Sequence, residues 1–458
     1  MISTKGFKAY DIRGVVPSDV NEELAYALGR SLAFYLKAKT LVIGHDIRLS
    51  GPSLRDAAVR GMRDMGTHVI DLGQCGTEMI YFAVAHLKAD GGMMITASHN
   101  PAEYNGMKLV RSESRPISGD TGLKDLAAMV TDPDFETKYP KAARQGSYEQ
   151  VDIVPSYVDH LLSYIDTKEI APLNIVANPG NGGAGPIVKE LAKHLPCHFT
   201  YLNDTPDGHF PNGVPNPLLV ENRDATSDAV RREGADLGIA WDGDFDRCFF
   251  FDENGRFIEG YYLVGLFASY FLKKHPGAKI LFDPRLIWNT EDIIAREGGY
   301  PVRCKSGHAF IKECMRREHV LYGGEMSAHH YFADFSYCDS GMIPWLLVIS
   351  LMSTSGLSLA EMVDASANIP AAEKSTAKWG MPMPSWNPCR RALNPASRTV
   401  WTGLASSMMN GASTFVNPIR NLWCVSMLKQ EEIGNFSNKR PVNFWTLSRA
   451  RKHKEAAV

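Results

Sequence analysis

The chain has 458 residues, of which 44% are hydrophobic and 22% are charged, with 49 Lys or Arg residues against 51 Asp or Glu residues. This composition is ordinary for a soluble globular protein, and the length predicts roughly three or four domains. Because the formal net charge is only −2, nothing in it predicts a nucleic-acid or membrane-surface partner.

Two nearly uncharged stretches, residues 261–272 and 342–352, are the longest of their kind. Both are shorter than the roughly 18 apolar residues that cross a bilayer, so we expect buried helices there. The residues after Met1 lack the apolar core of a secretory leader, and we expect a cytoplasmic protein. The eight cysteines form no CxxC pair and no zinc-ligand cluster, which favours reduced, unpaired thiols.

The first third of the chain alternates strand-like and helix-like segments. A strand at 41–46 leads into a helix that ends at Gly66, with Ser50 or Ser53 as its N-cap. A strand at 68–73, a helix at 78–87 and a strand at 91–97 follow.

The same alternation continues to about residue 370. A strand at 173–178 enters a Gly-rich turn before a helix at 187–195, and strands at 236–242 and 248–258 flank an acidic loop. Segments 279–286, 301–310 and 319–327 extend the pattern. Strands that alternate with helices predict the α/β fold class, here three consecutive α/β domains with mixed sheets. We place the domains at 1–150, 151–258 and 259–370.

Three aspartates alternate along the acidic loop WDGDFDR: Asp242, Asp244 and Asp246. Their mutual repulsion would cost stability unless a cation neutralised it, and an all-oxygen ligand set suits Mg²⁺. An EF-hand shares this spacing, with Glu253 at its twelfth position, but Arg247 stands where that loop needs glycine. A solvated acidic turn is the other alternative.

A second polar loop follows the strand at 91–97. In TASHNPAEYNGMKLV, the strand delivers Ser98 to a polar turn beside His99, and Lys108 lies ten residues further on. Such turns are common and are weak evidence alone. Together with the acidic loop, however, this segment completes the set of groups that phosphoryl transfer needs. The hydroxyl is a nucleophile, the imidazole an acid or base, the ammonium a positive charge, and the acidic loop would hold a Lewis acid.

Two later segments are candidate ligand loops. GEMSAHH places Glu325, Ser327 and His329 at alternate positions; if the segment is extended, they share one face and can bind adjacent sugar hydroxyls. A satisfied polar strand end is the alternative. KSGHAFIK places Lys305 and His308 ahead of a helix, which is a candidate anion site.

Four segments, FKAYDIRG, TASHNP, DGDFDR and GEMSAHH, resemble the motifs of the α-D-phosphohexomutase superfamily in their order and spacing. The resemblance covers about the first 370 residues. The first segment supplies Arg13, which could equally form a surface ion pair. The finer detail of KSGHAFIK, GEMSAHHYF and CDSGMIPWLL is similar to bacterial phosphomannomutases, which feed GDP-mannose and surface polysaccharide synthesis.

The resemblance implies a role for each candidate residue. The serine of that family carries a phosphate, gives it to a hexose 6-phosphate and takes another back from the reoriented bisphosphate. Mg²⁺ would be held by Asp242, Asp244, Asp246 and the phosphate on Ser98. The transfer site would be lined by Arg13, His99, Lys108 and Arg247, with Lys108 or His99 moving the proton. Substrate contacts would come from Lys305, His308, Glu325, Ser327 and His329.

The composition changes sharply near residue 371. Residues 372–458 contain 13 Lys or Arg, four Glu and no Asp, so this tail carries +9 and the preceding residues carry −11. Five of the eight tryptophans also lie in the tail. The family's fourth domain carries a phosphate-binding loop similar to Arg-Ser-Asn-Thr-Glu-Pro, and the tail has no such loop.

A shifted reading frame explains this change. Read one nucleotide out of frame with suitable synonymous codons, residues 410–425 become EWRFNVRKSNTEPVVR, and the segment after Ala371 becomes SGEINSKV. Both resemble the family. We therefore expect residues 371–458 to be out-of-frame sequence that replaces the fourth domain; the alternative is a native basic tail that binds an anionic partner.

Three functions follow from these expectations. The first is a phosphomannomutase, an isomerase that interconverts mannose 6-phosphate and mannose 1-phosphate with Mg²⁺ as cofactor. The second is a phosphoglucomutase with the same mechanism, and the third is an inactive remnant that still binds sugar phosphate. Hexose phosphates are the expected partners, without nucleic acid or membrane; the residues predict neither the sugar preference nor the oligomeric state.

Overall fold

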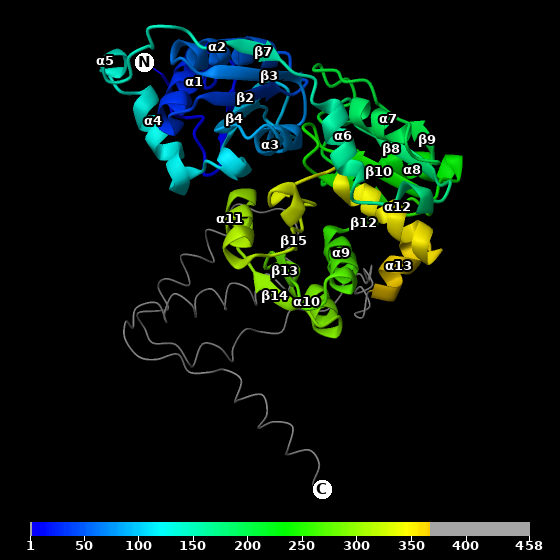
Figure 1. Ribbon diagram of the computed structural model, residues 1–458. Coiled ribbons are helices and arrows are strands. Elements are labelled where there is room, and N and C mark those ends of the chain that lie inside the picture. The colour runs from blue at the N-terminus through cyan, green and yellow to red at the C-terminus, as the bar shows by residue number, and fades with distance from the viewer. Residues whose placement is uncertain (1, 367–458) are drawn as a thin grey trace, which may run out of the picture. The chain divides into compact units, whose positions relative to one another are not determined.

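The structure is a computed structural model that describes residues 2–366 (Figure 1). The expectations for residues 371–458, including the shifted reading frame, lie outside the described residues. Within them the chain forms three mixed sheets, which appear in Figure 1 in blue to cyan, in green, and in green to yellow. The expected fold class, three α/β units with mixed sheets, is confirmed.

The first sheet has the strand order β1-β5-β4-β2-β3-β7, with β6 beside β5. Strand β2 is parallel to β3 and β4, whereas β5 is antiparallel to β1 and β4. Its strands are β1 (Ile12–Val15), β2 (Thr40–His45), β3 (His68–Gln74), β4 (Gly91–Ile95), β5 (Tyr104–Arg111), β6 (Arg115–Pro116) and β7 (Tyr148–Gln150). Its helices are α1 (Glu22–Leu36), α2 (Gly51–Asp64), α3 (Thr77–His86), α4 (Lys124–Val130) and α5 (Phe135–Lys138).

The second sheet has the order β12-β11-β10-β8-β9. Strand β10 is parallel to β8 and antiparallel to β11, so the β10–β11 connection is a tight loop. The strands are β8 (Asn174–Asn178), β9 (His198–Tyr201), β10 (Leu237–Trp241), β11 (Cys248–Phe251) and β12 (Phe257–Ile258). Helices α6 (Val154–Leu162), α7 (Ala184–Ala192) and α8 (Asp224–Glu233) accompany it.

The third sheet has the order β14-β13-β15-β16-β17. Its strands are β13 (Lys279–Phe282), β14 (Tyr300–Arg303), β15 (Tyr322–Gly324), β16 (His330–Phe332) and β17 (Cys338–Asp339). The helices of this part are α9 (Gly260–Lys274), α10 (Ile287–Arg296), α11 (His308–Glu318), α12 (Ile343–Ser355) and α13 (Leu359–Ser366). Short helical turns occur at η1 (Ser112–Ser114), η2 (Gly119–Leu123), η3 (Thr167–Glu169), η4 (Val220–Asn222) and η5 (Ala333–Phe335).

One hydrophobic cluster runs through all three units. It contains Tyr81 from α3, Trp241 from β10 and Trp345 from α12, all fully or almost fully buried. The stretch 261–272 lies within α9, and 342–352 lies within α12 apart from Met342, its N-cap residue; the apolar side chains of both helices are mostly buried, as expected. Burial of this much apolar surface holds the units together. The proposed boundaries at 150 and 258 stay a prediction.

Two further sequence expectations concern membranes and thiols. Among residues 2–366 no single helix is long and apolar enough to cross a membrane; α12 and α13 reach that length and composition together but are bent by 89°. The six cysteines of the described part are all free, as expected: Cys75, Cys197, Cys248, Cys304, Cys314 and Cys338.

Candidate functional site

The acidic loop connects β10 to β11. Carboxylate oxygens of Asp242, Asp244 and Asp246 all lie within 4.8 Å of one another, and the three side chains are buried. Within the described residues, one oxygen each of Asp244 and Asp246 is buried and accepts no hydrogen bond. Buried carboxylate oxygens of this kind in an all-oxygen cluster fit a hard divalent cation, so the donor set is suited to a metal.

Two basic side chains offset the charge of this loop. Lys108 Nζ lies 2.7 Å from Asp244 Oδ2 and 2.6 Å from Asp246 Oδ2, while Arg247 Nη2 lies 2.6 Å from Asp242 Oδ2. Burial lowers the pKa of Lys108, but the two carboxylates outweigh this and raise it. Burial raises the pKa of Asp242 to about 6 although Arg247 opposes the shift. Lys108 and Arg247 therefore neutralise part of the negative charge of the three aspartates, which the sequence analysis assigned to a metal cation alone.

Ser98 faces the acidic loop from the turn between β4 and β5. Its backbone has a left-handed φ of 51°, and the side chain is buried. Ser98 Oγ donates to Asp242 Oδ2 across 2.9 Å and lies 3.0 Å from His99 Nδ1. The nucleophile candidate and the metal-loop candidate are thus in direct contact, although they belong to different sheets.

Arg48, which the sequence did not single out, holds the backbone of this turn. The side chain is 1% exposed and lies 3.4 Å from Asp46. It donates to the carbonyl oxygens of Ser98 (2.9 Å), Asn100 (2.5 Å), Pro101 (2.6 Å) and Tyr104 (2.8 Å). One sequence signal could have identified it: in the segment HDIR, an aspartate and an arginine come directly after a buried strand. Because β2 and β4 are parallel neighbours, their carboxyl ends meet at one edge.

Asp46 reaches the same turn through a threonine. Thr96 Oγ1 donates to Asp46 Oδ2 across 2.6 Å and accepts from the Ser98 backbone N–H across 2.8 Å. The Ser98 backbone is therefore held on its amide side by this chain of bonds and on its carbonyl side by Arg48.

His99 and Arg13 lie beside Ser98. Arg247 Nη2 lies 2.5 Å from His99 Nδ1, and burial together with Arg247 and Arg13 lowers the pKa of His99 to about 3. Arg13 donates to Asn100 Oδ1 across 2.8 Å and pairs with Asp11. His99 is therefore neutral near pH 7, while Arg13 presents positive charge to the same turn.

The sugar-loop candidates lie in the tight turn between β15 and β16. The extended segment considered in the sequence analysis is wrong, because Ala328 has a left-handed φ of 67° and its N–H donates to the Glu325 carbonyl. The turn still gathers the side chains: His329 Nδ1 lies 3.1 Å from Ser327 Oγ and 3.4 Å from Glu325 Oε2.

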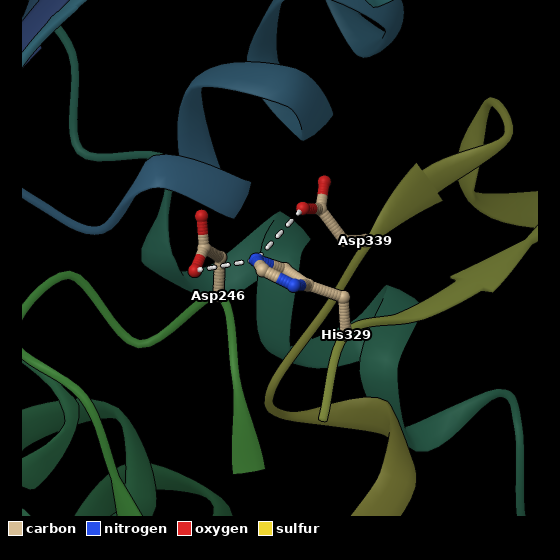
Figure 2. Close-up of side chains that lie close together, drawn as sticks. All are labelled: Asp246, His329 and Asp339. Atoms are coloured by element: carbon tan, nitrogen blue, oxygen red, sulfur yellow. Dashed lines mark ion pairs between the residues drawn. The ribbon is translucent and has the colours of Figure 1, made fainter. Parts of the chain in front are cut away.

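His329 links this turn to the acidic loop. Figure 2 shows its imidazole between two carboxylates, with Nε2 at 3.6 Å from Asp246 Oδ1 and 3.8 Å from Asp339 Oδ2. Burial lowers the pKa of His329, but Asp246, Glu325 and Asp339 outweigh it and raise the pKa. Asp339 also pairs with Lys312 Nζ at 2.6 Å. Neither Asp339 nor Lys312 was a candidate from sequence, because each has its partner in another segment of the chain.

Lys305 and His308 lie at the start of α11. Lys305 is exposed, with Nζ 3.3 Å from the centre of the Phe310 ring, and Gly307 N–H donates to Glu325 Oε1 across 2.9 Å. Both ring nitrogens of His308 are buried without a hydrogen-bond partner within the described residues. Unpaired polar atoms of this kind suit a polar ligand. The sequence candidates thus gather around the acidic loop and the sugar-loop turn, except Lys305, whose side chain contacts the Phe310 ring.

Comparison with known proteins follows the same three units. Models of the phosphoglucomutase/phosphomannomutase alpha/beta/alpha domains match this chain at residues 4–136 for domain I, 155–255 for domain II and 259–368 for domain III. Together these matches cover well over half of the chain.

Curated relatives and solved structures agree with those matches. The chain is 58% identical over 359 residues to "Phosphohexose mutases" of Xanthomonas campestris, covering 78% of this chain and 79% of the relative. It is 55% identical over 382 residues to "Phosphomannomutase" of Salmonella montevideo, covering 82% and 83%. A crystal structure of a phosphoglucomutase/phosphomannomutase family protein from Burkholderia thailandensis is 32% identical, with a TM-score of 0.74 over 81% of this chain and 80% of that one.

Proposed function

This chain belongs to the phosphoglucomutase/phosphomannomutase family, and from that premise we propose that it interconverts mannose 6-phosphate and mannose 1-phosphate through a phosphoserine at Ser98. It is a phosphohexomutase, an isomerase whose substrates are hexose phosphates. The mannose preference is supported by relatives named phosphomannomutase at 52–55% identity. The single observation that carries the proposal is the hydrogen bond of Ser98 Oγ to Asp242 in the acidic loop.

Mg²⁺ is the proposed metal. Asp242, Asp244, Asp246 and a phosphate on Ser98 would hold it. When bound, Mg²⁺ acts as a Lewis acid that stabilises negative charge on the transferring phosphoryl group. The support is the buried, partly unpaired all-oxygen donor set described above.

In the proposed reaction the phosphoryl group leaves Ser98 Oγ for the 1-hydroxyl of mannose 6-phosphate. The Ser98 O–P bond breaks, a new O–P bond forms at the sugar, and the hydroxyl proton passes to a base. The mannose 1,6-bisphosphate then reorients, its O6–P bond breaks as the 6-phosphoryl group returns to Ser98 Oγ, O6 takes back the proton from the base, and mannose 1-phosphate leaves. Arg13, Lys108 and Arg247 would position and neutralise the phosphoryl oxygens, since all three place positive charge around Ser98.

We propose His329 as the group that transfers the proton. The sequence left Lys108 or His99 as candidates, but Lys108 is held between two carboxylates and His99 has a pKa of about 3. His329 faces the acidic loop and lies in the turn that would bind the sugar hydroxyls with Glu325 and Ser327. An imidazole in that position is suited to general acid–base work. Lys305 and His308 would contact the sugar phosphate.

The test is a coupled mutase assay on the full chain with mannose 1-phosphate and with glucose 1-phosphate, beside Ser98→Ala. We expect turnover of the mannose substrate that Ser98→Ala abolishes. Faster turnover of glucose 1-phosphate would support the second candidate, a phosphoglucomutase, which the relatives named phosphohexose mutases favour. No turnover of either substrate, with sugar phosphate still bound, would support the inactive remnant.

The six free cysteines of the described part are evidence on the cellular location of the protein. Unpaired thiols are typical of reducing compartments, and on this basis we propose that the protein is cytoplasmic. Cell fractionation with an antibody tests this, and recovery in an extracytoplasmic fraction would contradict it.

A further inference from the structure

Glu78 is a fully buried carboxylate in the first turn of α3, outside the site described above. Three donors converge on it. Tyr157 OH and Ser340 Oγ donate to Oε1, the latter across 2.9 Å, and the Gly341 backbone N–H donates to Oε2.

The four groups come from all three units of the fold. Glu78 belongs to α3 of the first unit, and Tyr157 belongs to α6, which packs on α7 of the second. Ser340 and Gly341 directly follow β17 of the third sheet. The Glu78 side chain is thus one hydrogen-bonded point at which the three units meet.

Each end of this arrangement is one residue away from the proposed active site. On the side of α3, Thr77 Oγ1 donates to Asp244 Oδ2 across 2.5 Å, and Lys108 Nζ donates to the same Thr77 oxygen across 3.2 Å. The Thr77 N–H also donates to the Asp244 carbonyl. Any movement of the first turn of α3 therefore moves the acidic loop.

On the other side, Ser340 follows Asp339, which contacts His329. The Gly341 carbonyl oxygen accepts a hydrogen bond from Trp241 Nε1 across 2.9 Å. Trp241 directly precedes the first aspartate of the acidic loop. A Cβ on Gly341 would lie 2.4 Å from the Phe245 carbonyl oxygen, so this segment packs directly against the loop's backbone.

We propose that Glu78 is a positioning residue that fixes the acidic loop relative to the His329 turn. This inference deepens the proposed function, since it names the group that aligns the two halves of that site. A carboxyl group suits the position because its two oxygens face three hydrogen-bond donors and it carries no N–H group. Glutamine would turn an N–H₂ toward one of the three donors and leave that donor unpaired.

Hydrogen exchange of the full chain, read by mass spectrometry, tests the proposal without requiring activity. The variants are Glu78→Ala, Glu78→Gln and Tyr157→Phe, the last removing one donor and leaving the carboxylate in place. The matched control is Ser353→Ala, which removes the acceptor of the Ala171 N–H. This hydrogen bond joins α12 to the segment before β8 of the second unit and does not involve Glu78.

We expect peptides containing Gly341 and peptides spanning 242–247 to exchange at least about tenfold faster in Glu78→Ala. Glu78→Gln should show a smaller increase in the same two peptides, and Tyr157→Phe the smallest. Ser353→Ala should leave both unchanged. Unchanged exchange of the 242–247 peptides in Glu78→Ala and Glu78→Gln would overturn the proposal, because Glu78 would then be a purely local contact.

Mn²⁺ affinity, measured by electron paramagnetic resonance, adds a readout that a merely structural role would not move. We expect about tenfold weaker binding in Glu78→Gln and no change in Ser353→Ala. If Mn²⁺ binds equally to wild type and Glu78→Gln, the positioning role is overturned although the metal site stands. If wild type binds no Mn²⁺, the metal site of the proposed function fails, and the exchange of residues 242–247 decides the role of Glu78.

Discussion

Ser98 Oγ donates a hydrogen bond to Asp242 Oδ2 across 2.9 Å, although the two residues are 144 positions apart in the chain. The serine stands at the carboxyl end of a strand in the first sheet, and the aspartate stands at the carboxyl end of a strand in the second. Neither unit alone contains both residues of the proposed phosphoryl-transfer site. The proposed reaction therefore depends on groups that hold each loop in place and hold the units in register.

Arg48 holds the Ser98 turn, and its replacement tests that role. Arg48→Lys keeps the charge but cannot reach four carbonyl oxygens at once. We expect a loss of about 3 kcal/mol in the free energy of unfolding, measured by urea denaturation. Phosphate occupancy of Ser98, measured by mass spectrometry, should fall in parallel.

The matched control for Arg48 is Arg232→Lys. Arg232 is exposed and pairs across 2.9 Å with Glu233, which is also exposed. An exposed pair of this kind contributes less than about 1 kcal/mol, so this variant should keep nearly the stability of wild type. Equal losses of unfolding free energy in the two variants would show that the buried hydrogen bonds of Arg48 contribute no more to stability than an exposed ion pair does.

Thr77 orients the Asp244 carboxylate, and two conservative variants separate its hydroxyl from its shape. Thr77→Val removes the hydrogen bond to Asp244 Oδ2 and keeps the volume, whereas Thr77→Ser keeps the hydroxyl. We expect roughly 10- to 100-fold weaker Mg²⁺ binding in Thr77→Val, as for other groups that orient metal ligands, and less than about threefold in Thr77→Ser. Isothermal titration calorimetry measures both, and equal affinities would contradict the assignment.

The sequence predicted the parts of the site whose residues lie close together in the chain. The aspartate loop between two apolar strands and the Ser98 turn after a strand were both visible, because local periodicity and loop composition carry that information. Arg48, Glu78 and Asp339 were not, since each is a single polar residue whose partners lie in another segment or another sheet. The turn at Glu325 was also not predicted from the sequence, because its left-handed residue is Ala328 and not glycine, the residue type that usually marks such a conformation.

His329 is the proposed proton-transfer group, and its removal should affect the chemical step more than binding. His329→Asn is expected to lower kcat by about 10²- to 10⁴-fold, the usual contribution of a general acid–base group, with a much smaller change in KM. Steady-state kinetics with mannose 1-phosphate measures both constants.

His209→Asn is the control for His329. His209 is exposed and contacts only Asp207 among ionisable groups of the described part, so the variant should keep the wild-type kcat. If His329→Asn instead raised KM with kcat unchanged, His329 would bind the sugar without moving a proton.

The stability of the protein should depend on pH through Glu78. Burial raises its pKa to about 8 from an ordinary value of 4.5, even though the donors Tyr157, Gly341 and Ser340 favour the charged form; Asp246 adds to the rise. Between these two values the folded protein holds a proton that the unfolded chain releases. The Glu78 contribution to stability is therefore fully present below pH 4.5 and is lost as the pH rises toward 8.

Glu78→Gln cannot titrate, so subtracting its stability from that of wild type isolates this contribution. We expect the difference in free energy of unfolding, wild type minus Glu78→Gln, to fall as the pH rises from about 5 to about 8, by at most about 1.4 kcal/mol per pH unit. Urea denaturation at a series of pH values measures it. Tyr157 does not contribute, because burial keeps its pKa well above this range. A difference that stays constant with pH would mean that Glu78 is already ionised throughout the range, because the donors then outweigh its burial.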